Sequence, residues 1–255
     1  MGERTRYTPG TFCWADLLVA DPDAAQSFFH ALFGWHAEST PSGDHWMFTL
    51  GGKNVAGLEA AVGRPAAWLS YVSVEDADAA ARRAREAGAA MAAEPHDVGR
   101  PEMNVGRRGV LDDPQGAAFG LWQPGVHIGA TLVNSAGAMV WNQLETTDVE
   151  AAQHFYADLF GWTWEPLQGS AVPYARARNR GRRLTAGVMP LQAEDMAPRW
   201  QPSFTVADAA AACARVHELG GHVLVGPTDT PMGRIAVVAD PQGARFGFFD
   251  GEPEP

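Results

Sequence analysis

The chain is poor in cysteine and in basic residues, and it has no long apolar run. Cys13 and Cys213 are its only two cysteines, which excludes a disulfide framework and fits free thiols in a reducing compartment. Nineteen lysines and arginines stand against 30 aspartates and glutamates, for a formal net charge of −11. This balance argues against nucleic acid as a partner, because affinity for phosphates depends on Lys and Arg. No stretch reaches the roughly 20 apolar residues of a membrane span or forms an apolar signal segment. We therefore expect a cytoplasmic protein with no membrane partner.

An internal repeat dominates what is present. The segment Leu-Phe-Gly-Trp at 32–35 recurs at 159–162, and Asp-Pro-Gln-Gly at 113–116 recurs at 240–243, both 127 positions later. In the middle of each half the offset is 132, as between Trp68 and Trp200. The two halves therefore differ by short insertions on either side of this point, and such insertions fall in surface loops. The repeat predicts two similar domains, one over 9–126 and one over 127–251.

A weaker repeat divides each half into two modules. A strand-like run ending at Val19 is followed by Asp21, a good helix N-cap, and by Pro22, which suits the first helical turn. Apolar residues then recur at helical spacing until Gly34, the expected left-handed stop. Strand-like runs and an Asp-Pro-x-Gly hairpin turn follow. We therefore predict an α+β protein of four βαβββ modules, paired into two domains that each form a cup-shaped mixed sheet with the helices outside.

These features resemble the vicinal oxygen chelate superfamily, which includes glyoxalase I, bleomycin-resistance and fosfomycin-resistance proteins and extradiol dioxygenases. The capped helix ending in Phe-Gly-Trp and the Asp-Pro-x-Gly hairpin carry the resemblance, which covers roughly residues 9–250 and looks closest to tandem two-domain glyoxalase-like proteins. In metal-dependent members of that superfamily, the cup holds a divalent ion through a His or Gln on a module's first strand and a Glu on its last strand.

The matching positions here favour a protein without a metal or another cofactor. The first-strand positions carry Trp14, Leu69, Trp141 and Gln201, and the last-strand positions of the second and fourth modules carry Gly120 and Gly247. An indole is not a metal ligand and would fill the space of the ion. We therefore expect no metal site.

Side chains two residues apart on a strand share a face, so the strands that carry these positions also predict the lining of the cups. The expected lining is aromatic with a few polar groups, as in small-molecule pockets, and consists of Trp14, Asp16, Trp46, Tyr71, Trp122, Trp141, Gln143, Gln201, Ser203 and Phe249. Candidates for acid–base chemistry are Asp16, His45 and Glu145. The competing interpretation is that the aromatic residues are only core fillers.

Two functional hypotheses follow. The first is a metal-free binding protein of the glyoxalase or bleomycin-resistance type, which holds an aromatic or otherwise planar small molecule for sequestration, resistance or an accessory metabolic role. The alternative is a lyase, isomerase or dioxygenase-like enzyme with an atypical or absent metal site. We expect a monomer or a homodimer, since four modules in one chain complete both cups.

Overall fold

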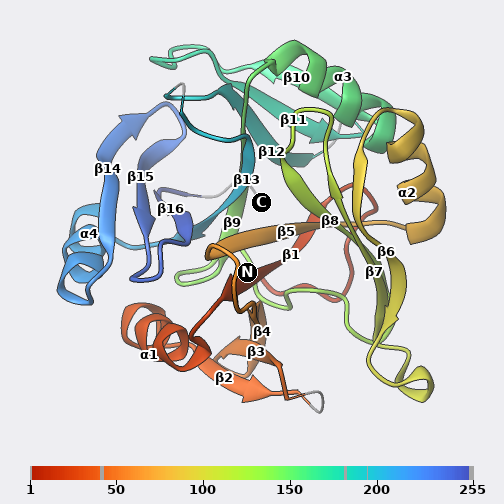
Figure 1. Cartoon of the computed structure of the whole chain (residues 1–255). Helices are drawn as coiled ribbons and strands as arrows, with labels where there is room; N and C mark the ends of the chain where they lie inside the picture. Colours follow the sequence, from red (N-terminus) through yellow and green to blue (C-terminus); the bar gives the residue numbers. More distant parts are fainter. Residues whose placement is uncertain (1, 41–42, 181–182, 194, 253–255) are drawn as a thin grey trace.

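The structure contains two similar halves, each with eight strands and two helices (Figure 1). It is a computed structural model that describes residues 2–40, 43–180, 183–193 and 195–252. The elements of the first half are β1 (Phe12–Val19), α1 (Pro22–Phe33), β2 (His36–Ser39), β3 (His45–Leu50), β4 (Lys53–Ala60), β5 (Ala67–Ser73), α2 (Ala77–Glu86), β6 (Ala90–Val98), β7 (Gly106–Asp112) and β8 (Ala118–Pro124). Those of the second half are β9 (Met139–Thr146), α3 (Val149–Phe160), β10 (Trp162–Pro166), β11 (Ala175–Asn179), β12 (Arg183–Pro190), β13 (Arg199–Thr205), α4 (Ala209–Glu218), β14 (His222–Thr230), β15 (Gly233–Ala239) and β16 (Arg245–Asp250). None of these helices is long and apolar enough to cross a membrane.

The strand order confirms four modules paired into two mixed sheets. The first sheet has the order β2-β3-β4-β1-β5-β8-β7-β6, and the second has the same order eight strands later, β10-β11-β12-β9-β13-β16-β15-β14. Within a module the first and last strands are parallel, as in β1 with β4 and β5 with β8. Two modules meet at an antiparallel pair, β1 with β5 or β9 with β13. The predicted α+β class is therefore confirmed.

The helix ends follow the local signals in the sequence. The Asp21 carboxylate accepts a hydrogen bond of 3.0 Å from the backbone N–H of Ala24, and α1 stops at Gly34 with φ at 73°. In α3, Asp148 caps in the same way and Gly161 stops the helix with φ at 72°. A residue with a Cβ would be strained at this left-handed position, which is why glycine recurs there.

The two halves pack against each other through their helix-bearing faces. Helix α1 lies beside α4, and α2 lies beside α3 (Figure 1). Phe29 of α1 contacts Phe246 with ring centroids 5.5 Å apart, and Phe33 contacts Phe204 at the same distance. The apolar core is thus shared between the halves. We call the helix-free faces of the two sheets the first cup (β1–β8) and the second cup (β9–β16).

The repeated Asp-Pro-Gln-Gly turns also join the halves. The Gln115 side chain accepts a hydrogen bond of 2.6 Å from the Thr146 hydroxyl and donates one of 2.8 Å to the Asp148 carbonyl. Gln242 accepts from the backbone N–H of Asp21 and donates to its carbonyl, at 2.9 and 2.8 Å. Each turn therefore fixes the strand–helix junction of the opposite half.

The tryptophans of the two Phe-Gly-Trp motifs have an equivalent role. The indole N–H of Trp35 donates to the carbonyl of Gly137, and that of Trp162 donates to the carbonyl of Gly10, both at 2.8 Å. Each acceptor lies in the segment that leads into the first strand of the other half. The motifs shared by both halves thus hold the halves together.

Candidate ligand-binding site

Strand register decides which predicted residues face the first cup. Trp14 pairs with Tyr71, and Asp16 pairs with Gly57. Because residues paired across a ladder share a face, Trp14, Asp16 and Tyr71 lie together in the first cup. Trp122 lies there as well, two residues after the Gly120 that pairs with Tyr71.

The prediction that Trp46 lines the first cup is wrong. Trp46 pairs with Leu58, and Leu58 pairs with Leu17 of β1. Leu17 in turn pairs with Trp68, whose ring contacts Phe29 of α1, so Trp46 lies on the helix-bearing face. Its neighbour His45 pairs with Glu59 and so points the other way, into the first cup. Adjacent residues of one strand cannot both face the cup.

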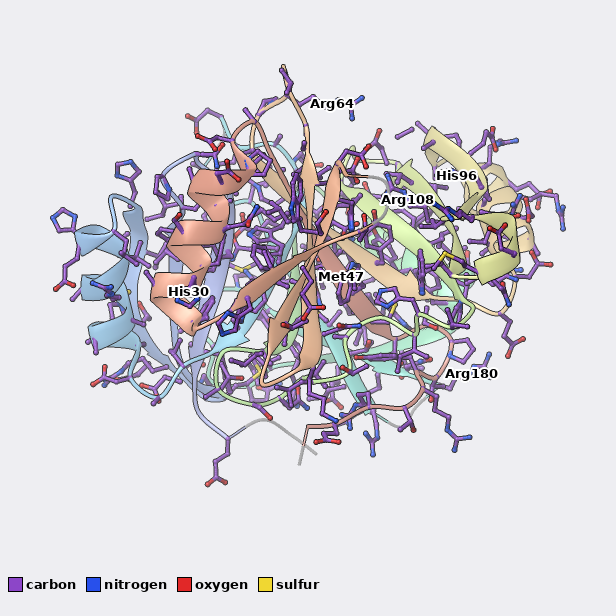
Figure 2. All side chains as sticks on the ribbon, turned by 90° about the horizontal axis from the view of Figure 1, so that it is seen from below. His30, Met47, Arg64, His96, Arg108 and Arg180 are labelled. Carbon is purple, nitrogen blue, oxygen red and sulfur yellow. The ribbon has the colours of Figure 1, made fainter. Side chains whose placement is uncertain are left out.

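A polar cluster occupies the first cup. One oxygen of Asp16 accepts a hydrogen bond of 2.7 Å from the Trp14 indole and lies 3.4 Å from Nε2 of His45. The other oxygen lies 3.9 Å from the Arg108 guanidinium, which also forms an ion pair of 3.0 Å with Glu59. In Figure 2, Met47, Arg108 and His96 follow one another across the strands of this sheet.

Opposite charges hold both members of the Asp16–His45 pair in their ionised forms. Burial alone would raise the pKa of Asp16, but the hydrogen bond and charge of His45, aided by Arg108 and Trp14, hold it below its ordinary value. Burial alone would lower the pKa of His45, yet the bond to Asp16 and its charge raise it. The pair is therefore an ion pair at moderately acidic pH.

The floor of the first cup is closed. Trp14, Asp16 and Tyr71 are only 4%, 3% and 1% exposed. The His127 ring packs edge-on against Trp14 at 4.7 Å, and its backbone carbonyl accepts a hydrogen bond of 2.9 Å from the Trp122 indole. Burial lowers the pKa of His127 to about 4, so this ring is neutral near pH 7. The Tyr71 hydroxyl is buried and has no hydrogen-bond partner among the described residues.

The second cup has the same backbone but a different lining. Trp141 pairs with Ser203, and Gln143 pairs with Gln201. Ser203 also pairs with Gly247, and the next residue but one, Thr205, pairs with Phe249. Register therefore places all five predicted lining residues of this half on one face, and these are Trp141, Gln143, Gln201, Ser203 and Phe249. Glu145, opposite Arg199, lies on the same face.

This second cup is more open than the first. Trp141, Gln143 and Ser203 are half-buried, in contrast to the closed positions of the first cup. The Trp141 indole donates a hydrogen bond of 2.8 Å to the Tyr174 hydroxyl, which lies over Gly187, where a side chain would overlap it. Burial raises the pKa of Tyr174, so the phenol stays protonated.

The residues at the superfamily's metal positions do not fit a divalent ion. The Trp14 indole is bonded to Asp16, and a side chain added at Gly120 would overlap the Tyr71 ring. At Gly247 an added side chain would overlap the Ser203 hydroxyl. Arg108 already places a cation beside Asp16 and Glu59. Across the described part of the chain, no group of three or more His, Cys, Asp or Glu side chains is placed to hold a metal ion.

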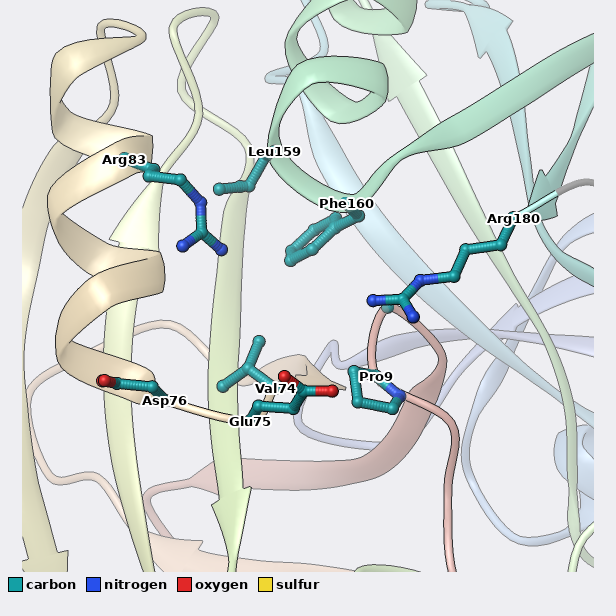
Figure 3. Close-up of a pocket in the computed structure, with 9 residues that line it drawn as sticks. Pro9, Val74, Glu75, Asp76, Arg83, Leu159, Phe160 and Arg180 are labelled. Carbon is teal, nitrogen blue, oxygen red and sulfur yellow. The ribbon is translucent and has the colours of Figure 1, made fainter.

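A surface cleft of about 140 Å³ lies between the halves, away from both cups. Figure 3 shows Arg83 of α2 and Arg180 on opposite sides of it, with Glu75 below and Phe160 of α3 above. None of the predicted site residues lines this cleft.

Comparison with known proteins agrees with the architecture. The sequence profile described as "Glyoxalase-like domain" matches residues 13–122 and again 138–249. "Putative glyoxylase CFP32" of Mycobacterium tuberculosis (strain CDC 1551 / Oshkosh) is 36% identical over 264 residues, covering 100% of both chains. "Anthracycline biosynthesis protein DnrV" of Streptomyces peucetius is 35% identical over 268 residues, covering 96% of this chain and 95% of that protein. The Mn(II)-bound glyoxalase from Novosphingobium aromaticivorans has the same fold, with a TM-score of 0.70 at 14% identity, covering 100% of this chain and 84% of that one. The chain belongs to the glyoxalase-like family, within the vicinal oxygen chelate superfamily.

Several residues of the cups were not found from the sequence. Arg108 pairs with Trp122 across the β7–β8 hairpin, so the register of that hairpin would have placed it in the first cup. His127 lies outside the strands, and no periodic pattern points to it. Tyr174, Arg199 and Arg245 lie at or just before strand ends, where the limits of the predicted strands are least certain.

Proposed function

We propose that this protein binds a planar aromatic small molecule in its second cup, without a metal ion, in an accessory role in small-molecule metabolism. The observation that carries the proposal is the difference between repeat-equivalent positions. Trp14 and Asp16 are closed off in the first cup, whereas Trp141 and Gln143, 127 positions later, are half-buried and accessible. The exposed part of Trp141 and Gln143 is thus available for contact with a ligand.

The lining of the second cup suits a flat ligand that carries a few polar groups. Trp141, Tyr174 and Phe249 supply aromatic surface, and Gln143 and Ser203 supply hydrogen-bonding groups. This combination is typical of small-molecule sites. The relative DnrV is named for anthracycline biosynthesis, and anthracyclines are planar polycyclic compounds, which supports a ligand of that shape.

Titration calorimetry with soluble anthraquinones tests the proposal. We expect Trp141→Phe to weaken binding about tenfold, because the smaller ring loses stacking area and the hydrogen bond to Tyr174. The matched control is Trp14→Phe at the equivalent position of the closed cup, which should leave the affinity unchanged. Dialysis against EDTA should also leave it unchanged. Equal losses in both variants, or loss of binding after EDTA, would contradict the proposal.

Acid–base catalysis in the first cup is a second candidate. The observation that favours it is His45, which is partly exposed and held 3.4 Å from the buried Asp16. Asp16 would then orient the imidazole, and His45 would transfer the proton. A screen of lyase and isomerase substrates tests this candidate. Turnover that is lost in His45→Gln and reduced in Asp16→Asn would support it, and turnover undiminished in both variants would exclude it.

A further inference from the structure

The second cup carries more positive than negative groups, although the whole chain has a net charge of −11. Arg176 pairs with Gly187 and Arg199 with Glu145, and Arg245 lies two residues before Gly247, so all three share the face of Trp141. Arg178 binds the same carboxylate as Arg176. Among the described residues identified on this face, four guanidinium groups stand against the two carboxylates of Glu145 and Glu165.

The two carboxylates are unevenly shared among these arginines. Glu165 is shared by Arg176, at 2.7 Å, and Arg178, at 3.0 Å. Glu145 lies 3.9 Å from Nε of Arg199. Arg245 has no hydrogen bond or ion pair with any residue that the structure describes, and its Nε is buried.

The electrostatic surroundings of Arg199 also favour the binding of an anion. Burial lowers the pKa of Arg199, and the nearby charge of Arg245 lowers it further, while Glu145 only partly opposes them. Two guanidinium groups therefore lie close enough to repel each other. Arg199 is partly satisfied, since its Nε and Nη2 donate hydrogen bonds of 3.0 and 2.8 Å to the Ala197 carbonyl. Arg245 has no such partner in the described part of the chain. A partly buried charge without a partner is costly, and an anion beside both arginines would reduce that cost.

A buried amide lies next to the same position. Gln201 is 2% exposed, and its Oε1 has no partner in the described part of the chain. It lies two residues before Ser203, which pairs with Gly247, and so stands beside Arg245 on the neighbouring strand. Its Oε1 is an acceptor, so it can take a hydrogen bond from a neighbouring arginine, whereas only Nε2 of the same amide can donate to a carboxylate.

Both arginines are specific to the second half. The repeat offsets of 132 and 127 place Ala67 at the position of Arg199 and Ala118 at that of Arg245. The repeated fold therefore does not require a cation at either position, since the first half forms the same sheet with alanine there.

We propose that the second cup recognises a carboxylate on its aromatic ligand, with Arg199 and Arg245 as the anion-binding pair. This inference rests on the proposed function and names its ligand as an aromatic carboxylic acid. The planar fork of arginine matches a carboxylate through two parallel hydrogen bonds. Trp141 pairs with Ser203, and Ser203 pairs with Gly247. Arg245 therefore lies two strands across and two residues along from Trp141, and their Cα atoms are separated by roughly 10–15 Å. A polycyclic acid can lie against Trp141 and place its carboxylate between the arginines.

A matched pair of probes tests this charge preference. Anthraquinone-2-carboxylate and anthraquinone-2-carboxamide have the same ring system and differ in charge. We expect the intact protein to bind the acid about tenfold more tightly than the amide, as measured by titration calorimetry. The preference should decrease as salt is raised, because screening weakens partly exposed charge pairs.

Substitutions then assign the preference to the two arginines. Arg245→Gln and Arg199→Gln should each reduce it, Arg245→Lys should retain part of it, and the control Arg215→Gln on exposed α4 should leave it unchanged. Circular dichroism of each variant checks that the fold is intact. Equal affinity of the wild type for both probes, or a preference that survives both glutamine variants, would overturn the anionic ligand and leave the proposed function standing. Binding of neither probe would contradict the proposed function and this inference together.

Discussion

Phe29 and Tyr156 occupy repeat-equivalent buried positions that differ by one hydroxyl group, so reciprocal substitutions at these positions should have opposite effects on stability. The Tyr156 hydroxyl accepts a hydrogen bond of 2.7 Å from the Trp200 indole and donates one of 3.0 Å to the Asp113 carboxylate. The repeat places Phe29 at the equivalent position. Around it, the Trp68 indole and one oxygen of Asp240, the counterparts of Trp200 and Asp113, are buried without partners in the described structure.

The magnitudes follow from the number of buried groups affected. Tyr156→Phe leaves an indole N–H and a carboxylate oxygen unpaired, and each such loss costs roughly 1–3 kcal/mol, so we expect a destabilisation of about 2–6 kcal/mol. Phe29→Tyr supplies the missing hydroxyl to two groups that already lack partners, so we expect a gain of about 1–2 kcal/mol. The ring positions are equivalent, with Phe29 stacked on Trp35 at 5.3 Å and Tyr156 stacked on Trp162 at 5.5 Å.

Equilibrium unfolding in urea measures both changes. The matched control is Phe28→Tyr, because Phe28 is buried in the same core and its repeat equivalent, Phe155, also carries no hydroxyl. We expect Phe29→Tyr to raise the free energy of unfolding and Phe28→Tyr not to raise it. A destabilised Phe29→Tyr variant, or an unchanged Tyr156→Phe variant, would refute the reasoning from equivalent positions.

Two further predictions concern the Asp16–His45 pair and the turns that join the halves. Because the folded state raises the pKa of His45, its stabilisation is complete below the unfolded value of about 6.5 and is lost as pH rises through the folded value. Because the folded state lowers the pKa of Asp16, its stabilisation is present above about pH 3.9 and is lost as pH falls through the folded value. His45→Gln should therefore flatten the decline in urea midpoint above about pH 6.5, and an unchanged pH profile would contradict the ion pair. Gln115→Ala and Gln242→Ala each remove hydrogen bonds between the halves and should lower the free energy of unfolding by about 1–2 kcal/mol. Gln192→Ala, at an exposed residue whose side chain donates to the nearby Pro190 carbonyl, should be neutral, and equal effects of all three would argue against a joining role for the turns.

The sequence predicted the features that depend on local chemistry. The Asp21 cap and the Gly34 stop follow from neighbouring residues alone, and the structure contains both, together with their repeat equivalents Asp148 and Gly161. The internal repeat also predicted the four modules, because equivalent sequences fold alike.

The features that depend on register or on the other half were harder to predict. Alternation separated Trp46 from His45 but did not say which of them faces the cup, and only the pairing of Trp46 with Leu58 decides this. The Phe-Gly-Trp motif signalled a helix end, whereas the bond from Trp35 to Gly137 spans 102 positions of sequence. No local pattern carries such a contact.

The central claim, that the second cup and not the first receives the ligand, is tested most directly by fluorine NMR of protein labelled with 5-fluorotryptophan. The Trp14 and Trp141 resonances are assigned with the Trp14→Phe and Trp141→Phe variants, and anthraquinone-2-carboxylate is then titrated. We expect the Trp141 resonance to shift in a saturable manner while the Trp14 resonance stays in place. A saturable shift of Trp14 with Trp141 unchanged would contradict the account.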